Sequence, residues 1–325
     1  MRSTGMLSRI AESLFWIGRY VERADDTARI LEAFLAGMLS DPWLDEDAAC
    51  RALLAILGSP PPHDGRLSGG DVLESMGFDL DNPSSIAGAL AAARDNARGA
   101  RETISSEMWE CLNVTWHSLQ SRRVAAEHLG HGLFLGFVRE RAAVLTGLAE
   151  STMSRDDGWR FLVLGRNLER VDMTARLLSI QSLEYAPEWR TVLRACGADE
   201  SFLRTHGGEV VPQRVAEFLL LDRLFPRSAL HALTEAEECL EALAPSTERA
   251  GMADAARRPV GQARTRLEYA DAATLMDELP THLRSLQRAV TAALAAAPAR
   301  CNERRWGGNS SMRVAASAYS SRVRA

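Results

Sequence analysis

Apolar residues recur at helical spacing in residues 15–31 and again in residues 162–178, and these two segments repeat each other without a gap at an offset of 147 residues. If each residue advances by about 100°, the apolar positions fall within an arc of roughly 100°, the width of a core-facing stripe. In the first copy these positions are Leu14, Ile17, Val21, Ala24, Ala28 and Leu31, and in the second they are Leu164, Leu168, Val171, Ala175 and Leu178. The pattern predicts two equivalent helices, each with one face in the core.

The polar positions of the two copies agree better than the apolar ones. Glycine and charged residues are identical at Gly18/Gly165, Arg19/Arg166, Glu22/Glu169, Arg23/Arg170, Asp25/Asp172 and Arg29/Arg176. In the first copy the glycine, the two carboxylates and the last arginine form a stripe of roughly 60° directly beside the apolar stripe. Charges at the edge of a core need a counter-charge or a ligand. Glycine inside a helix costs up to ~1 kcal/mol relative to alanine, so its repetition indicates a close approach by another helix or a ligand.

Two interpretations fit this charged stripe. In the first, the repeat helices meet about a pseudo-twofold axis, and Glu22 and Glu169 each pair with an arginine of the other copy as a buried structural lock. In the second, the stripe lines a cleft that binds a polar substrate or a partner segment. The candidate cleft residues are Arg19, Glu22, Arg23, Asp25, Arg29, Arg166, Glu169, Arg170, Asp172 and Arg176.

Similar reasoning extends to the rest of the chain and predicts helices over about 6–38, 41–58, 81–112, 131–152, 156–182, 187–197, 231–244 and 262–296, with an exposed loop at 59–71. Pro226 and Ser228 match Pro83 and Ser85, so the duplication extends beyond one helix. No segment has a convincing strand period. We therefore expect an all-α, internally duplicated helical bundle with a pseudo-twofold repeat. It forms one domain over 1–297, built of repeats at about 6–150 and 153–296, and is followed by a disordered basic tail at 298–325.

Composition narrows the chemistry. The chain has no lysine, so Schiff-base catalysis and a lysine-bearing phosphate loop are excluded, and an anion site must use arginine or a helix N-terminus. The net charge of −5 does not favour nucleic acid. The five cysteines have no CxxC spacing, and the sequence has no signal peptide and no apolar run long enough to span a membrane. We therefore expect a cytoplasmic protein with free thiols. Glycines break the helix around His128 and His131 and no third ligand is nearby, so we expect neither a metal nor a cofactor.

A second charged group lies in residues 94–113. Arg94, Arg98 and Arg101 have helical i, i+4 and i+7 spacing, and acidic and amide side chains follow at similar spacing. A solvated helix face explains such a pattern equally well. The secondary site candidates are Arg98, Glu107, Trp109 and Asn113.

Four separated motifs resemble the bacterial alpha-E family, a predicted all-helical family with a repeated Glu-Arg motif. They are LSRIAESLFWIGRYVERADDTARIL, SSEMWECLN, DDGWRFLVLGRNLERVDMTARLL and FLLLDRLFPRSAL, and the resemblance covers about residues 6–295. The Glu-Arg pairs are Glu22-Arg23 and Glu169-Arg170. The resemblance implies an association with circularly permuted ATP-grasp ligases and transglutaminase-like peptidases. That setting implies ATP-dependent peptide or amide synthesis and its reversal, and in some relatives the ligase and this domain are fused.

Three functions fit these observations. The chain is an accessory or substrate-holding subunit of an ATP-grasp peptide or amide ligase system, in which arginine forks clamp carboxylates or phosphates. Alternatively it is an enzyme of amide or peptide chemistry in which Glu22 and Glu169 act as paired carboxylates, one of them a general base. In the third interpretation it is purely a structural scaffold. No nucleophile or cofactor motif supports the enzyme, and we expect a peptide, rather than a membrane or nucleic acid, as the ligand.

Overall fold

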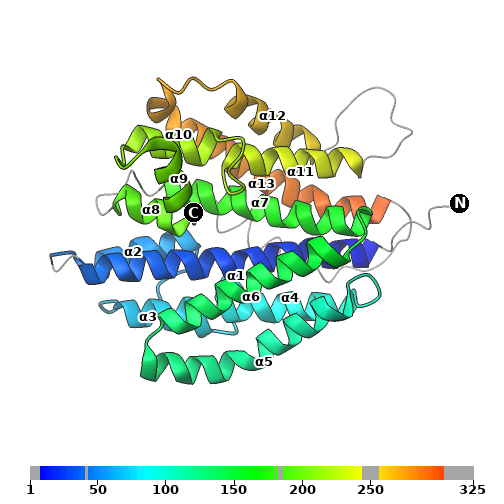
Figure 1. Cartoon of the computed structure of the whole chain (residues 1–325), viewed down its shortest axis with the longest axis horizontal. Coiled ribbons are helices and arrows are strands. Elements are labelled where there is room, and N and C mark those ends of the chain that lie inside the picture. The colour runs from blue at the N-terminus through cyan, green and yellow to red at the C-terminus, as the bar shows by residue number, and fades with distance from the viewer. Residues whose placement is uncertain (1–7, 41–42, 180, 182–185, 244–255, 304–325) are drawn as a thin grey trace, which may run out of the picture.

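The computed structural model describes residues 8–40, 43–179, 181, 186–243 and 256–303, and this part of the chain is all-α and contains no strand (Figure 1). Its helices are α1 (Ser8–Ser40), α2 (Glu46–Leu57), α3 (Gly69–Leu73), the π-helix η1 (Glu74–Phe78), α4 (Ile86–Gly99), α5 (Ser106–Leu129), α6 (Gly132–Thr152), α7 (Asp157–Ser179), α8 (Trp189–Ala195), α9 (Asp199–His206), α10 (Pro212–Leu221), α11 (Ala229–Ala242), α12 (Arg257–Glu268) and α13 (Leu275–Glu303).

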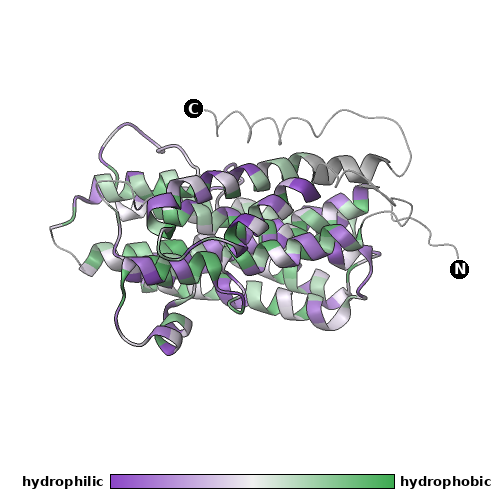
Figure 2. Cartoon of the chain, turned by 90° about the horizontal axis from the view of Figure 1, so that it is seen from above, coloured by the Kyte–Doolittle hydropathy of each residue, from purple (hydrophilic) through white to green (hydrophobic). Residues whose placement is uncertain are grey.

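The two repeat helices, α1 and α7, pack against each other at the centre of the bundle. On one side α1 contacts α4 and α6, and α5 packs on both of these; on the other side α7 contacts α11 and α13, and α12 packs on both of those (Figure 1). Many of the helices carry both hydrophobic and hydrophilic residues, as amphipathic helices around a shared core do (Figure 2). The candidate cleft residues, which are all on α1 and α7, therefore lie at the middle of the molecule.

The core stripes predicted from the sequence are buried. Leu14, Ala24, Ala28 and Leu31 are fully buried in α1, and Leu164, Leu168, Val171 and Ala175 are fully buried in α7. Each helix is also buried on its polar side, because the other repeat helix covers that side. This explains why the charged stripe lies inside the protein instead of at the edge of the core, where the sequence alone places it.

Glycine allows the two repeat helices to cross at very short range. A Cβ atom on Gly18 would lie 2.0 Å from the carbonyl oxygen of Leu162, and a Cβ atom on Gly165 would lie 2.1 Å from that of Phe15. The two contacts are reciprocal, since Phe15 and Leu162 are themselves matched positions of the repeat. The close approach predicted for these glycines is thus an approach of helix backbone to helix backbone.

Matched local structure also occurs at the Pro-Ser turns. The Ser85 hydroxyl donates to the carbonyl of Asp79 and accepts from the Gly88 amide, and the Ser228 hydroxyl donates to the carbonyl of Asp222 and accepts from the His231 amide. Each serine caps the helix that follows it. These paired geometries are local observations, and the duplication of the whole chain as a pseudo-twofold repeat stays a prediction.

Three predicted elements differ from the structure. The helical run expected over 81–112 is divided, because the chain leaves α4 at Gly99 and the Ser105 hydroxyl caps the start of α5. The helix expected over 262–296 is likewise divided, by a turn at 269–274 in which the Asp271 carboxylate accepts from the backbone of Ala273. The expected loop at 59–71 ends earlier, because α3 begins at Gly69 with a Ser68 capping box.

The C-terminal boundary also moves. Helix α13 continues to Glu303, so the first residues of the predicted disordered tail, 298–303, are helical. The alanine-rich stretch that precedes them has the strongest intrinsic helix propensity and carries the helix onward. The remaining predicted tail, 304–325, lies outside the described residues. Within the described part of the chain, none of the helices has the length and apolar character needed to cross a bilayer.

Candidate functional site

Glu169 of α7 is enclosed by two arginines of α1. Arg23 donates from Nε to Oε1 at 2.6 Å and from Nη2 to Oε2 at 3.1 Å, which makes a bidentate pair. Arg19 donates from Nε to Oε2 at 2.6 Å. The Glu169 side chain is 1% exposed and that of Arg19 is 2% exposed, so this carboxylate and its first partner are cut off from water.

The reciprocal pair joins Glu22 of α1 to Arg170 of α7. Arg170 donates from Nε at 2.8 Å and from Nη2 at 3.2 Å to the two carboxylate oxygens. A second arginine, Arg227, lies 2.8 Å from Glu22. Each glutamate of the repeated Glu-Arg motif therefore pairs with the motif arginine of the other copy, which is the arrangement expected of a structural lock between two helices.

Both glutamates are held in the ionised form. Burial by itself raises the pKa of each carboxyl group, but the positive charges outweigh it and lower each pKa to about 2. Arg170 and Arg227 do this for Glu22, and Arg19 and Arg23 do it for Glu169. A carboxylate with so low a pKa accepts a proton poorly near neutral pH, which disfavours either one as a general base.

Arg227 is a site residue that the sequence reasoning missed. It follows Pro226 in the turn before α11, and it contacts Glu22, Asp25 and Asp26, each through an ion pair. The matched turn of the first half carries Ser84 at this position, and Asp26 itself is matched by Met173. Asp26 of the first half and Arg227 of the second are thus both charged, whereas their matched positions, Met173 and Ser84, are both uncharged, and this joint difference is the sequence signal for the pair.

Asp26 differs electrostatically from the two glutamates. Burial raises its pKa to about 8, and the negative charges of Glu22 and Asp25 add to the effect, although Arg227 opposes it. Arg227 opposes it only in part, because its guanidinium is shared among three carboxyl groups, whereas Glu169 alone contacts both Arg19 and Arg23. Of the described carboxyl groups of this cluster, Asp26 therefore holds its proton most tightly.

The pKa of Asp26 predicts a pH-dependent stability. Its folded pKa of about 8 is above the unfolded value of 3.8, so the native state binds this proton more tightly and loses stability as the pH rises from about 4 through 8. Asp26→Asn removes this loss. We expect urea unfolding to show the variant gaining more than about 1 kcal/mol on wild type between pH 5 and pH 9. The exposed Asp95→Asn serves as the control, and an Asp26→Asn difference independent of pH would contradict the raised pKa.

The remaining members of the stripe form intrahelical pairs. Arg29 donates to Asp25 at 3.0 Å and Arg176 to Asp172 at 3.1 Å, each across one turn. Each arginine also lies against a glycine that follows the end of another helix, Gly197 after α8 for Arg29 and Gly58 after α2 for Arg176. A Cβ atom on Gly197 would lie 2.8 Å from Arg29, and one on Gly58 would lie 2.6 Å from Arg176. Arginine at a helix C-terminus complements the carbonyl ends, and both glycines have positive φ there.

Arg166 breaks the symmetry of the stripe. Its counterpart Arg19 pairs with Glu169 across the helix crossing, whereas Arg166 donates at 3.2 Å to Glu150 of α6. Two cavities beside the stripe are small, with volumes of about 20 Å³ next to Glu22 and Arg166 and about 10 Å³ next to Asp26 and Arg227. Neither exceeds the space of roughly one water molecule. The candidate cleft residues are brought together, but the cavities beside them are too small for a substrate.

The three acidic residues Glu22, Asp25 and Asp26 have oxygens within 4.8 Å of one another, a spacing suited to a cation. The guanidinium of Arg227 contacts all three of these carboxylates. A bound cation would have to displace it. The guanidinium of Arg227 therefore supplies the positive charge that a metal ion would bring to these carboxylates.

Of the secondary candidates, Trp109 and Asn113 lie in one group where α4 meets α5, whereas Arg98 and Glu107 do not join it. Arg94 donates to Asn113 at 2.8 Å and lies over the ring of Trp109, and Arg101 lies over the same ring with 4.9 Å between its guanidinium carbon and the ring centroid. Arg98 is exposed and 3.6 Å from Asp95, and Glu107 is exposed in the first turn of α5. Two guanidinium groups are thus within cation–π distance of the Trp109 ring.

Comparison with known proteins gives one family. The model of the Alpha-E family, described as a predicted alpha-helical domain with a conserved ER motif, matches residues 6–297. Among curated proteins, uncharacterized proteins of Mycobacterium bovis and Mycobacterium tuberculosis are similar, each 26% identical over 253 residues. These matches cover 69% of this chain and 28% of each relative, so the chain spans little more than a quarter of the length of these relatives. No solved structure matches.

Proposed function

The chain belongs to the Alpha-E family, and on that premise we propose that it is an accessory helical subunit of an ATP-grasp peptide or amide ligase system. In this proposal its Glu-Arg stripe fixes α1 against α7, and its outer surfaces hold the ligase or a peptide substrate. The observation that carries the non-catalytic role is the internal pairing of both motif glutamates with arginines of the opposite helix.

The pairing supports an accessory role for a chemical reason. General acid-base catalysis needs a group whose pKa is near the working pH and that reaches the substrate. Glu22 and Glu169 have a pKa of about 2 and are 4% and 1% exposed at the side chain. The enzyme alternative, in which these carboxylates act on an amide, thus lacks both properties in this arrangement.

The length of the relatives supports association with other domains. The curated relatives are several times longer than the region they share with this chain, since that region is 28% of their length. A helical domain that occurs within longer chains is suited to work beside other domains. This is in keeping with the resemblance stated above, which implies an ATP-grasp ligase as the partner.

The proposal is tested with a purified circularly permuted ATP-grasp ligase from the same genome. We expect the two proteins to form a complex by analytical ultracentrifugation and the chain to raise the rate of ADP formation with peptide substrates. The same binding experiment is carried out in parallel with the transglutaminase-like peptidase. A ligase that neither binds the chain at micromolar concentration nor responds to it, or a chain that binds the peptidase alone, would contradict the ligase assignment.

A further inference from the structure

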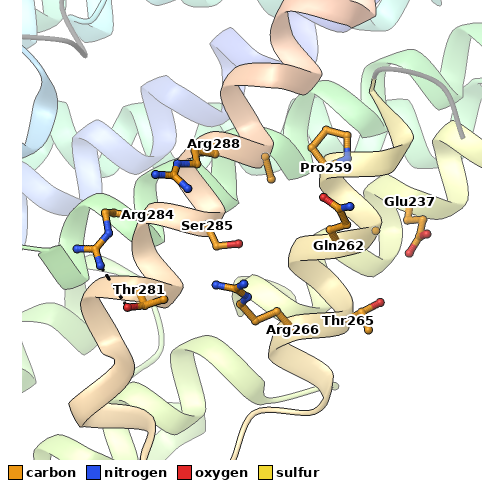
Figure 3. A pocket seen from close by; sticks show the side chains of 11 residues that line it. Glu237, Pro259, Gln262, Thr265, Arg266, Thr281, Arg284, Ser285 and Arg288 are labelled. Atoms are coloured by element: carbon orange, nitrogen blue, oxygen red, sulfur yellow. Dashed lines mark hydrogen bonds between the residues drawn. The ribbon is translucent and has the colours of Figure 1, made fainter.

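A hollow much larger than the two cavities beside the Glu-Arg stripe has none of the stripe residues in its lining. It lies between α12 and α13 with α11 at one wall, and its volume is about 980 Å³. Figure 3 shows Arg266 and Gln262 projecting from α12 on the side that faces α13. The polar side chains that line it include Gln262, Arg266, Thr281, Arg284, Ser285 and Arg288. We call this hollow the α12–α13 groove.

Three arginines of the groove are not neutralised. Arg266, Arg284 and Arg288 are exposed, and none of them is within ion-pair distance of a carboxylate in the described residues; Arg284 donates only to the Thr281 hydroxyl, at 3.2 Å. Arg264, two residues from Arg266, gives the contrast, because it pairs with both Glu237 and Glu268. The acidic residue in the wall, Glu237, is thus neutralised by Arg264, and the groove carries a net positive charge.

The donor set selects a class of ligand. Guanidinium groups bind carboxylate and phosphate oxygens through paired N–H donors, and the hydroxyls and the amide of the lining add neutral hydrogen-bond partners. Among the described residues that line the groove none is aromatic, so these residues offer no surface on which a nucleobase would stack. The net charge of −5 on the whole chain also opposes a polyanion as long as a nucleic acid.

The spacing of the arginines fits an extended peptide. Arg284 and Arg288 are one helical turn apart on α13, which places their Cβ atoms about 6 Å apart on one face. In an extended peptide, alternate side chains point the same way and are about 6.6 Å apart. Two acidic residues in an i, i+2 relation therefore match the two guanidinium groups, while Arg266 meets the peptide from α12.

We infer that the α12–α13 groove binds an acidic peptide segment in an extended conformation, through pairing of its carboxylates with Arg266, Arg284 and Arg288. This goes beyond the proposed function and does not depend on it, because the binding is a property of this chain alone. The chemistry of the groove defines the partner as a peptide with glutamate or aspartate at alternate positions. Binding requires neither a nucleobase nor an aromatic ring in this partner.

The experiment measures fluorescence anisotropy of a labelled octaglutamate with the full chain. Octaglutamine and an oligothymidylate of equal length are the comparison probes. We expect octaglutamate to bind, octaglutamine not to bind, and Arg284→Gln/Arg288→Gln to weaken octaglutamate binding by about tenfold, because two exposed ion pairs are lost. Added salt also weakens the wild-type binding, since the pairs are accessible to ions.

A matched double variant separates the groove from general charge. Arg204→Gln/Arg214→Gln removes two exposed arginines outside the groove lining and leaves the same net charge as the groove variant. We expect it to bind octaglutamate like wild type, and thermal unfolding verifies that both variants fold. Equal weakening by the two doubles, no weakening by the groove double, or tighter binding of the oligothymidylate than of octaglutamate would overturn the inference.

Discussion

Glu169→Gln is expected to lower the free energy of unfolding by about 3–5 kcal/mol, because it leaves Arg19 and Arg23 charged and without their shared partner. Glutamine keeps the size and the hydrogen-bonding oxygen of the side chain, so the loss reports the charge. The measurement is urea unfolding at pH 7, followed by circular dichroism. A loss below about 1 kcal/mol would mean that the buried pairing does not lock the helices.

The reciprocal variant, Glu22→Gln, is the internal control. Its arginines are 13% and 14% exposed at the side chain, compared with 2% for Arg19, and Arg227 keeps Asp25 and Asp26 as partners. We therefore expect a smaller loss than for Glu169→Gln, although the two positions are matched in the repeat. Combining Arg19→Gln with Glu169→Gln rebalances the charge and should recover part of the stability.

Acid titration provides an independent readout of the same carboxylates. The folded pKa of Glu169 is about 2, below its ordinary value of 4.5, so its contribution is complete above pH 4.5 and is lost as the pH falls toward 2. Wild type and Glu169→Gln should therefore converge in stability over this interval. If Glu169→Gln instead folds as wild type does but no longer binds the ligase, the cleft interpretation of the stripe replaces the lock.

Gly18→Ala is the second change with a large expected effect, a loss of about 3 kcal/mol. The added methyl group would lie 2.0 Å from the carbonyl oxygen of Leu162, which is helix backbone and cannot turn away as a side chain does. The α1–α7 crossing must open, and that lengthens the ion pairs on either side of it. Gly165→Ala should behave similarly, since its methyl group would lie 2.1 Å from the carbonyl oxygen of Phe15.

Gly147→Ala is the matched control for helix propensity. Gly147 is inside α6, is exposed, and has no atom within 4 Å of the position of an added Cβ. Alanine should stabilise the protein there by up to ~1 kcal/mol, the ordinary gain of removing glycine from a helix. The sign of the effect thus reverses between the two sites, and thermal unfolding measures both. A neutral Gly18→Ala would contradict the close crossing.

Helical periodicity was enough to predict the two repeat helices and their inner faces. Apolar residues at helical spacing, such as Leu14 and Leu31, are buried where the period of 3.6 predicts, because an amphipathic helix has one way to shield that stripe from water. The repetition of Gly18 and Glu22 in the second copy identified the residues that meet at the helix crossing, since close contact and buried charge both restrict what a position tolerates.

Which charges meet depends on the packing of helices that are far apart in the chain. Arg227 is 201 residues from Asp26 in the chain, and helical periodicity relates only residues a few positions apart, so no local pattern places its guanidinium beside that carboxylate. The same holds for the α12–α13 groove, whose walls are separate helices divided by the turn at Asp271 that periodicity did not predict. Pairing partners, the raised pKa of Asp26 and the free arginines of the groove depend on distances through space, and packing of the whole bundle sets those distances.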